Sequence, residues 1–289
     1  MTKALIKAMR PKQWAKNIFL TAGLVFSRQL TNMNAISNTA LAIILFSLLA
    51  SAVYLINDIG DVEADRKHPK KKNRPIASGA LKESSARIAV IILVIIVFSG
   101  AYLLSKSFLV VCVFYFILNL SYSKWIKHIP LLDLLVLASF YIIRVVAGIS
   151  VIEVQHFSPW LYVATSFVAL FMGIGKRRAE LVMAQEKGIS SRKVLESYTL
   201  PFLDQLTTIV LTITIVTYSL YTFSAPNLPD NNIMMITIPF VIYGIFRYLY
   251  LVQVEGHGEA PDEIVLSDRP FQINIIMWGI TVFLIFYIY

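Results

Sequence analysis

The strongest constraint on the fold of this chain is a series of long apolar runs separated by short polar segments. A run of about 20 apolar residues is long enough to cross the hydrocarbon core of a bilayer as an α-helix. The content of hydrophobic residues, 57%, also exceeds the roughly 45–50% that is typical of soluble domains. We therefore predict an all-α integral membrane protein, with 1–289 forming a single polytopic domain. Nine spans are expected, at 14–30, 36–58, 85–104, 107–123, 131–151, 158–175, 199–223, 232–252 and 271–288.

The first run is the weakest, because only Ile18 to Phe26 is free of polar residues, but the distribution of positive charge supports it. With nine spans, 22 of the 26 Lys and Arg residues lie on one side of the membrane. Cytoplasmic loops carry such an excess of positive charge. We therefore predict a multi-pass protein of the cell (inner or plasma) membrane with a cytoplasmic N-terminus. The segments on the basic side are the N-terminus, 59–84 with Arg87, 124–130, 176–198 and 253–270.

The net charge of +9 raises the possibility of a nucleic-acid partner. Here the cations flank apolar runs, so anionic lipid headgroups and anionic substrates explain them better, and no nucleic-acid partner is expected. The single cysteine, Cys112, lies within an apolar run, and the four histidines are scattered. This pattern argues against a disulfide framework and against a zinc site.

The segment most indicative of chemistry follows the second span, where Asn57, Asp58, Asp61 and Asp65 precede a basic stretch. If the helix continues through this segment, residues three and four apart share one face. Several carboxylates on one face repel each other unless a cation joins them, and hard oxygen ligands suit Mg²⁺. The sequence therefore predicts a magnesium site; the alternative is an ordinary solvated helix end.

Further basic residues that bear on function lie at four places in the chain. Arg74 lies between Asn73 and Pro75, and an arginine fork matches phosphate oxygens. Three consecutive cations, residues 176–178, follow the sixth span with Glu180 close behind, and they suggest an anion pocket or, alternatively, a plain topology signal. Arg144 and Arg247 lie inside spans, where a charged residue faces either a cavity or a partner.

The combination of motifs resembles the UbiA superfamily of intramembrane prenyltransferases. The resemblance rests on Asn57-x₃-Asp61-x₃-Asp65, on Arg74-Pro75-Ile76-x₂-Gly79 and on Tyr122-Ser123. It implies nine helices around a central cavity and Mg²⁺-dependent transfer at the cytoplasmic face. Asp58, Asp61 and Asp65 would be the catalytic metal-binding carboxylates, with Asn57 as a further ligand.

Within this superfamily the chain is most similar to the decaprenyl-phosphate phosphoribosyltransferase branch. Ordinary members have a second aspartate-rich motif after the sixth helix, where this chain has Lys176-Arg177-Arg178-Ala179-Glu180. The resemblance then implies 5-phosphoribosyl 1-diphosphate (PRPP) as the donor and a polyprenyl phosphate as the acceptor. The residues expected to bind substrates are Lys16, Asn57, Arg66, Arg74, Tyr122, Lys127, Lys176, Arg177 and Glu180.

Two other functions remain open on the sequence. One is a UbiA-type enzyme that transfers a prenyl group from a prenyl diphosphate to an aromatic or other small acceptor. The other is a transporter or channel with a cation site, which explains the intramembrane arginines but not the gathering of polar motifs on one face. The length of the isoprenoid, a possible homo-oligomer and a role in cell-wall biosynthesis are also left open.

Overall fold

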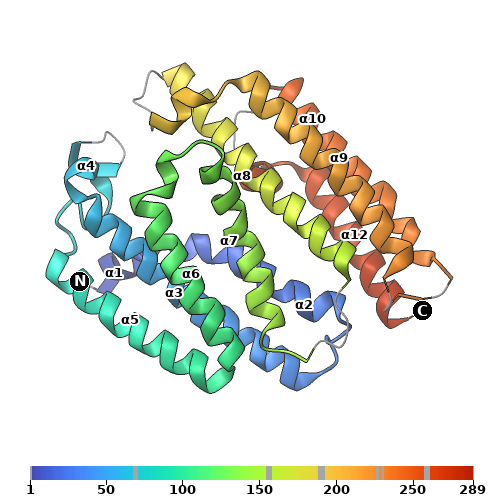
Figure 1. Ribbon diagram of the computed structural model, residues 1–289, viewed down its shortest axis with the longest axis horizontal. Helices are drawn as coiled ribbons and strands as arrows, with labels where there is room; N and C mark the ends of the chain where they lie inside the picture. Colours follow the sequence, from blue (N-terminus) through green and yellow to red (C-terminus); the bar gives the residue numbers. More distant parts are fainter. Residues whose placement is uncertain are drawn as a thin grey trace. The chain divides into compact units, whose positions relative to one another are not determined.

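A computed structural model describes residues 2–67, 71–153, 158–187, 193–225, 228–229, 231–256 and 261–288. The described residues form helices and turns and contain no strand (Figure 1). Eight of the helical segments are long and apolar enough to cross a membrane, which confirms the predicted all-α membrane class. They are α3 (Met33–Gly60), α5 (Glu83–Leu104), α6 (Lys106–Lys124), α7 (Leu132–Ile149), α8 (Pro159–Lys187), α9 (Leu200–Ser224), η5 (Ile233–Thr237) continuing into α10 (Ile238–Gln253), and α12 (Arg269–Tyr287).

The first predicted span, 14–30, has a different structure from the other eight. After the short helix α1 (Thr2–Ala8), residues Pro11–Leu20 form the 3₁₀ helix η1, and Thr21–Phe26 form the short α-helix α2. A proline at the first position suits a helix start because its missing N–H would have no partner there. The predicted count of nine spans is therefore not confirmed, since this segment is not one long α-helix.

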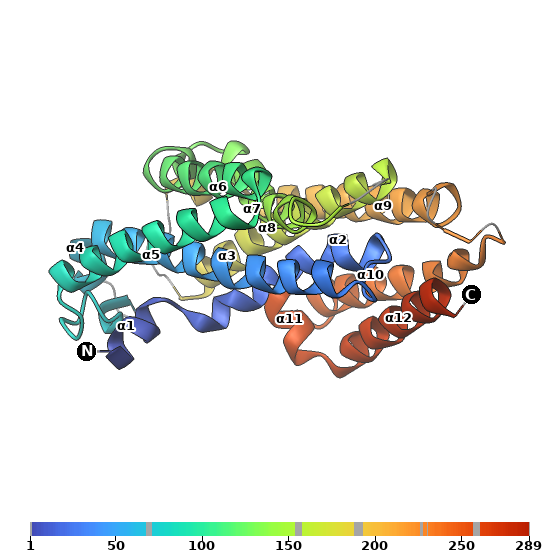
Figure 2. The ribbon, with the colours of Figure 1, turned by 90° about the horizontal axis from the view of Figure 1, so that it is seen from below.

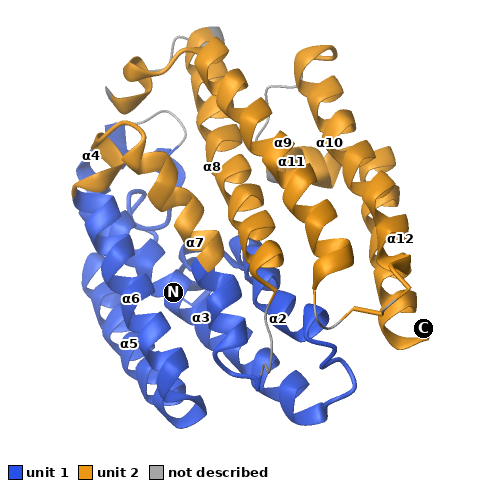
Figure 3. Ribbon diagram, turned by 45° about the vertical axis from the view of Figure 1, so that its right-hand side comes forward, with its two compact units in different colours: residues 1–124, 143–154 blue, residues 125–142, 155–289 orange. Residues whose placement is uncertain are grey.

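The chain divides into two compact units, which Figure 3 shows in blue and orange. The first contains 1–124 and 143–154, and the second contains 125–142 and 155–289, so the division crosses α7. The prediction of a single domain stays a prediction, as does that of a central cavity.

In the first unit, α3 lies beside α5 and α6 (Figures 1 and 2). Two short helices follow α3 in the chain, α4 (Val62–Lys67) and the 3₁₀ turn η2 (Lys71–Asn73). Ile76 and Leu81, which follow η2 in the chain, pack with Leu55 of α3 and Ala86 of α5 in a buried apolar cluster. Burial of these side chains fixes the turn that carries Arg74.

In the second unit, α8 lies along α9, and α10 lies along α12. Ile174 of α8 packs with Leu203 of α9 and Leu134 of α7 in a buried cluster. This cluster fixes the part of α8 that carries the basic residues 176–178. The remaining short helices of the unit are η3 (Ile126–His128), η4 (Lys193–Ser197) and α11 (Pro261–Ser267).

The helix α5 offers a direct test of the predicted orientation, because exposed residues flank both of its ends. The helix is 22 residues long, or about 33 Å at 1.5 Å per residue, which is enough to cross the hydrocarbon core. We expect a cysteine at Ser78 to react with an impermeant maleimide from the cytoplasmic side only, and one at Lys106 from the opposite side only. Cys112 is buried and provides the unreactive background. Labelling of both positions from the same side would contradict the proposed topology.

Candidate active site

The acidic segment lies at the junction between α3 and α4. The helix is interrupted at Asp61, so the condition of a continuous helix, on which the shared face was argued, is not met at this residue. Backbone hydrogen bonds from Asp61 N–H to Asn57 and from Asp65 N–H to Asp61 nevertheless keep the spacing of four residues. The spacing of Asn57, Asp61 and Asp65 by four residues is therefore kept across the interruption.

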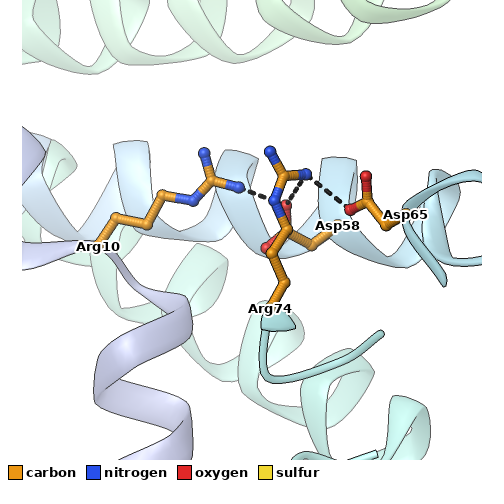
Figure 4. Close-up of polar contacts among 4 residues, drawn as sticks. All are labelled: Arg10, Asp58, Asp65 and Arg74. Carbon is orange, nitrogen blue, oxygen red and sulfur yellow. Dashed lines mark hydrogen bonds and ion pairs between the residues drawn. The ribbon is translucent and has the colours of Figure 1, made fainter. Parts of the chain in front are cut away.

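Two of the carboxylates, those of Asp58 and Asp65, are buried and bound by arginines (Figure 4). The Nη1 atom of Arg74 donates to Asp65 Oδ2 at 2.7 Å and to Asp58 Oδ1 at 3.2 Å. Arg10 donates from Nη2 to the same Asp58 oxygen. Two guanidinium groups and two carboxylates thus converge at the end of α3, and their charges balance.

This cluster leaves one carboxylate oxygen, Asp58 Oδ2, buried and without a hydrogen-bond partner. A buried acceptor without a partner costs free energy, so its presence points to a missing donor or cation. Among the described residues, however, no three His, Cys, Asp or Glu side chains lie close enough together to hold a metal ion. The arrangement offers two convergent carboxylates, which is the number that Mg²⁺ commonly takes when substrate phosphates complete its coordination.

The N-terminal segment is attached to α3 by a series of polar contacts that ends at Asp58. Trp14 Nε1 donates to Ser51 Oγ at 3.0 Å, and Asn17 Nδ2 donates to Ser47 Oγ at 2.8 Å. Together with the Arg10 pair, these contacts run antiparallel along one side of α3. They fix the segment that carries Lys16, whose side chain is half-buried.

Arg144 of α7 stabilises the same N-terminal segment. Its Nε donates to Asn17 Oδ1 at 2.9 Å, and its Nη2 donates to the hydroxyl of Tyr115 at 3.2 Å. The guanidinium also lies over the rings of Phe46 and Tyr115. This intramembrane arginine is therefore held by uncharged groups and by aromatic faces.

The other predicted site residues of the first unit lie at varied depths. Asn57, Asp61 and Tyr122 are half-buried. Arg66 is exposed, and it donates to Glu63 at 2.6 Å on the surface of α4. In the second unit, Lys127 is half-buried on the turn η3.

Two basic residues of α8, Arg177 and Arg178, are bound to carboxylates, one of them from α8 itself and two from other helices. Arg177 has no exposed side-chain surface, and it donates to Asp133 and, at 2.6 Å, to Glu180. Arg178 donates to Asp204 of α9 at 2.6 Å. The predicted contact between Arg177 and a phosphate stays a prediction, but the guanidinium lies inside the protein.

Residues 17–264 match the sequence model of the UbiA prenyltransferase family. The chain belongs to this family. It is 36% identical to decaprenyl-phosphate phosphoribosyltransferase of Mycobacterium tuberculosis, across 98% of this chain and 94% of that protein. It is 35% identical to the protein of the same name from Corynebacterium glutamicum, across 100% of this chain and 88% of that protein.

Solved structures of the family confirm the fold of this UbiA chain. The structure of a UbiA homolog from Archaeoglobus fulgidus bound to GPP and Mg²⁺ aligns with a TM-score of 0.74 at 18% identity, covering 98% of this chain and 99% of that one. A structure of digeranylgeranylglyceryl phosphate synthase aligns with a TM-score of 0.68 at 17% identity, covering 100% and 99%. The chain is thus a UbiA-family transferase, an enzyme with several membrane-spanning helices.

The ion-pair clusters around Asp58 and Arg177 contain three residues that were not among the predicted site residues. They are Arg10, Asp133 and Tyr198. Arg10 reaches Asp58 from 48 positions earlier in the chain. Asp133 and Tyr198 are joined to each other across 65 positions. An aspartate at the start of an apolar run was the available signal for Asp133, because a charged residue there requires a partner.

Proposed function

We propose that this chain transfers the 5-phosphoribosyl group from PRPP to a polyprenyl phosphate and releases diphosphate. The observation that carries the proposal is the identity of 35–36%, over nearly the full length, to enzymes named decaprenyl-phosphate phosphoribosyltransferase. The reaction would take place at the cytoplasmic face of the cell membrane.

Mg²⁺ is the proposed cofactor. Related solved structures are described as bound to GPP and Mg²⁺ or to DMAPP and Mg²⁺. In this chain the buried oxygen of Asp58 that has no partner, and the convergence of Asp58 with Asp65, fit a divalent cation. Asp61 and Asn57 would complete the protein ligands. When bound, Mg²⁺ neutralises negative charge on the departing diphosphate.

In the proposed reaction, an oxygen of the polyprenyl phosphate attacks C1 of the ribose. The bond between C1 and the diphosphate oxygen breaks, and the diphosphate leaves with the electron pair. Because the attacking phosphate is already anionic, no strong general base is required. We assign Arg74 to the diphosphate oxygens, which an arginine can bind by a fork-like contact; its partly exposed side chain beside Asp58 and Asp65 supports this assignment.

Other polar residues are also assigned to parts of the two substrates. We assign Glu180 to the ribose hydroxyls, since its carboxylate is the partly exposed end of the Arg177 pair. Arg10 joins the proposed set because it binds the same Asp58 oxygen as Arg74. The remaining phosphate and headgroup contacts are assigned to Lys16, Arg66, Tyr122, Lys127 and Lys176.

The decisive experiment incubates the purified protein with PRPP, Mg²⁺ and a panel of polyprenyl phosphates, followed by mass spectrometry of the lipid fraction. We expect a polyprenyl phosphate enlarged by one 5-phosphoribosyl group and an equal amount of diphosphate. We also expect EDTA to abolish the product and added Mg²⁺ to restore it. Consumption of a prenyl diphosphate with an aromatic acceptor, and indifference to PRPP, would instead establish the ordinary prenyltransferase alternative.

A further inference from the structure

A buried network in the second unit joins α7, α8 and the connection between η4 and α9 through one carboxylate, that of Asp133. Tyr198, which lies between η4 and α9, donates its hydroxyl to Asp133 Oδ1 at 2.6 Å. Arg177 Nε donates to the other oxygen, Asp133 Oδ2. Both oxygens of a fully buried aspartate are thus satisfied, one by a phenol and one by a guanidinium.

The network extends in two directions from Asp133. The backbone N–H of Leu131 donates to the Tyr198 oxygen at 2.6 Å, and Arg177 Nη1 donates to Glu180 Oε2 at 2.6 Å. Of the side chains in this network, those of Asp133 and Arg177 have no exposed surface, whereas that of Glu180 is 28% exposed. The network therefore begins in the interior and ends at a carboxylate that solvent reaches.

Tyr198 has a further role at the start of α7. Leu131 has a backbone φ of 64°, which is rare for a residue with a Cβ and costs conformational energy. The hydrogen bond from its N–H to Tyr198 stabilises this conformation, and Leu131 lies three positions after the end of η3, the turn that carries Lys127. Burial raises the pKa of Tyr198 to about 12, so the hydroxyl remains protonated and donates to Asp133 at any physiological pH.

We propose that Asp133, Arg177 and Tyr198 are positioning residues that fix the carboxylate of Glu180 for binding the sugar end of the donor. This inference rests on the proposed function, which assigns Glu180 to the ribose hydroxyls. It replaces the predicted role of Arg177, because a fully buried guanidinium that is bound to two carboxylates acts through Glu180. A glycosyl donor with free ribose hydroxyls is the substrate class that such a carboxylate recognises by accepting hydrogen bonds.

A double-mutant cycle tests the proposal. We expect Tyr198→Phe to raise the apparent KM for PRPP about fivefold to tenfold, the effect of losing one hydrogen bond in the network. Glu180→Gln alone should also raise this KM, whereas the KM for polyprenyl phosphate should change less than about twofold. In the Glu180→Gln background, adding Tyr198→Phe should have an effect below about twofold, because coupled residues are not additive. The matched control is Tyr162→Phe, an exposed tyrosine of α8, which should behave as wild type.

Several outcomes would overturn the proposal. If the two substitutions multiply in the double variant, Tyr198 does not act through Glu180. If Tyr198→Phe lowers only the yield of folded protein and leaves the KM for PRPP unchanged, its role is merely structural. Glu180→Gln replaces a partly exposed side chain and should fold, so an unchanged KM in this variant also contradicts the proposal.

The network itself can be tested without turnover, by hydrogen exchange of the amide groups in 126–135. Tyr198→Phe should accelerate exchange at Leu131, whereas Tyr162→Phe should not, and equal exchange in both variants would contradict the network.

Wild-type turnover of PRPP tests the proposed function separately. An active wild type with an unaltered Tyr198→Phe variant would reject the positioning role alone, whereas a wild type that ignores PRPP would reject both the proposed donor and the ribose role of Glu180.

Discussion

Asp65→Asn is expected to lower the rate of phosphoribosyl transfer by about two orders of magnitude while the protein still inserts and purifies. The Asp65 carboxylate is buried, and it shares the Nη1 atom of Arg74 with Asp58. The substitution removes one negative charge from the proposed magnesium ligands and one partner from Arg74. Loss of a single group that stabilises charge in a transition state commonly costs about a hundredfold to a thousandfold in rate.

The matched control for this prediction is Glu63→Gln in the same helix, α4. Glu63 has a side chain that is 76% exposed and pairs with Arg66 on the surface, where an ion pair contributes little to stability. We expect its turnover to remain within about twofold of wild type. Mg²⁺ with diphosphate should raise the melting temperature of wild type and of Glu63→Gln but not of Asp65→Asn. Equal turnover and equal stabilisation in all three proteins would rule out a metal-binding role for Asp65.

The membrane helices were predicted well because hydropathy is a local property of the sequence. The run at 36–58 corresponds to α3 at Met33–Gly60, and the run at 107–123 corresponds to α6 at Lys106–Lys124. The first run, 14–30, is not confirmed as one long helix, and it contacts a residue distant in sequence: Gly148 of α7 lies against the backbone of Leu20 at the end of η1. Hydropathy contains no information on such an approach.

The candidate site was predicted where its residues are close in sequence and missed where they are not. The spacing of Asp61 and Asp65 follows from the local backbone, which the structure retains across the interruption of the helix. A run of cations, by contrast, does not reveal which of them is bound to a carboxylate. Arg177 was predicted to contact phosphate, and its partner Asp133 lies 44 positions earlier in the chain.

Asp133 shows why contacts between residues distant in sequence matter for assigning function. A buried arginine requires a carboxylate or several acceptors, because leaving its charge unpaired in the interior is very costly. Asp133 and Glu180 meet that requirement, which supports the proposal that Arg177 acts through Glu180. The basic sequence at 176–178 therefore combines residues that hold the helices of the unit together with residues that remain candidates for substrate binding.

Gly148→Ala is expected to leave little folded protein. Its effect on stability should exceed that of the other substitutions. A Cβ at Gly148 would lie 1.9 Å from the carbonyl oxygen of Leu20 and 2.7 Å from its carbonyl carbon. These are backbone atoms, so no side-chain rotation relieves the clash, and η1 must move away from α7. Such a movement would also break the contact between Arg144 and Asn17, which joins the same two segments one turn earlier.

Two other glycines provide graded controls for this prediction. Gly279→Ala in α12 meets nothing within 4 Å, so it should be neutral or slightly stabilising. Gly23→Ala meets the side-chain Cγ1 of Ile149 at 2.9 Å, which a rotamer change relieves in part, so an intermediate loss is expected. The measurement is the yield of monodisperse protein in size-exclusion chromatography, together with the midpoint of thermal unfolding in detergent. If Gly148→Ala matches Gly279→Ala in both measurements, η1 does not lie against α7 as the structure has it.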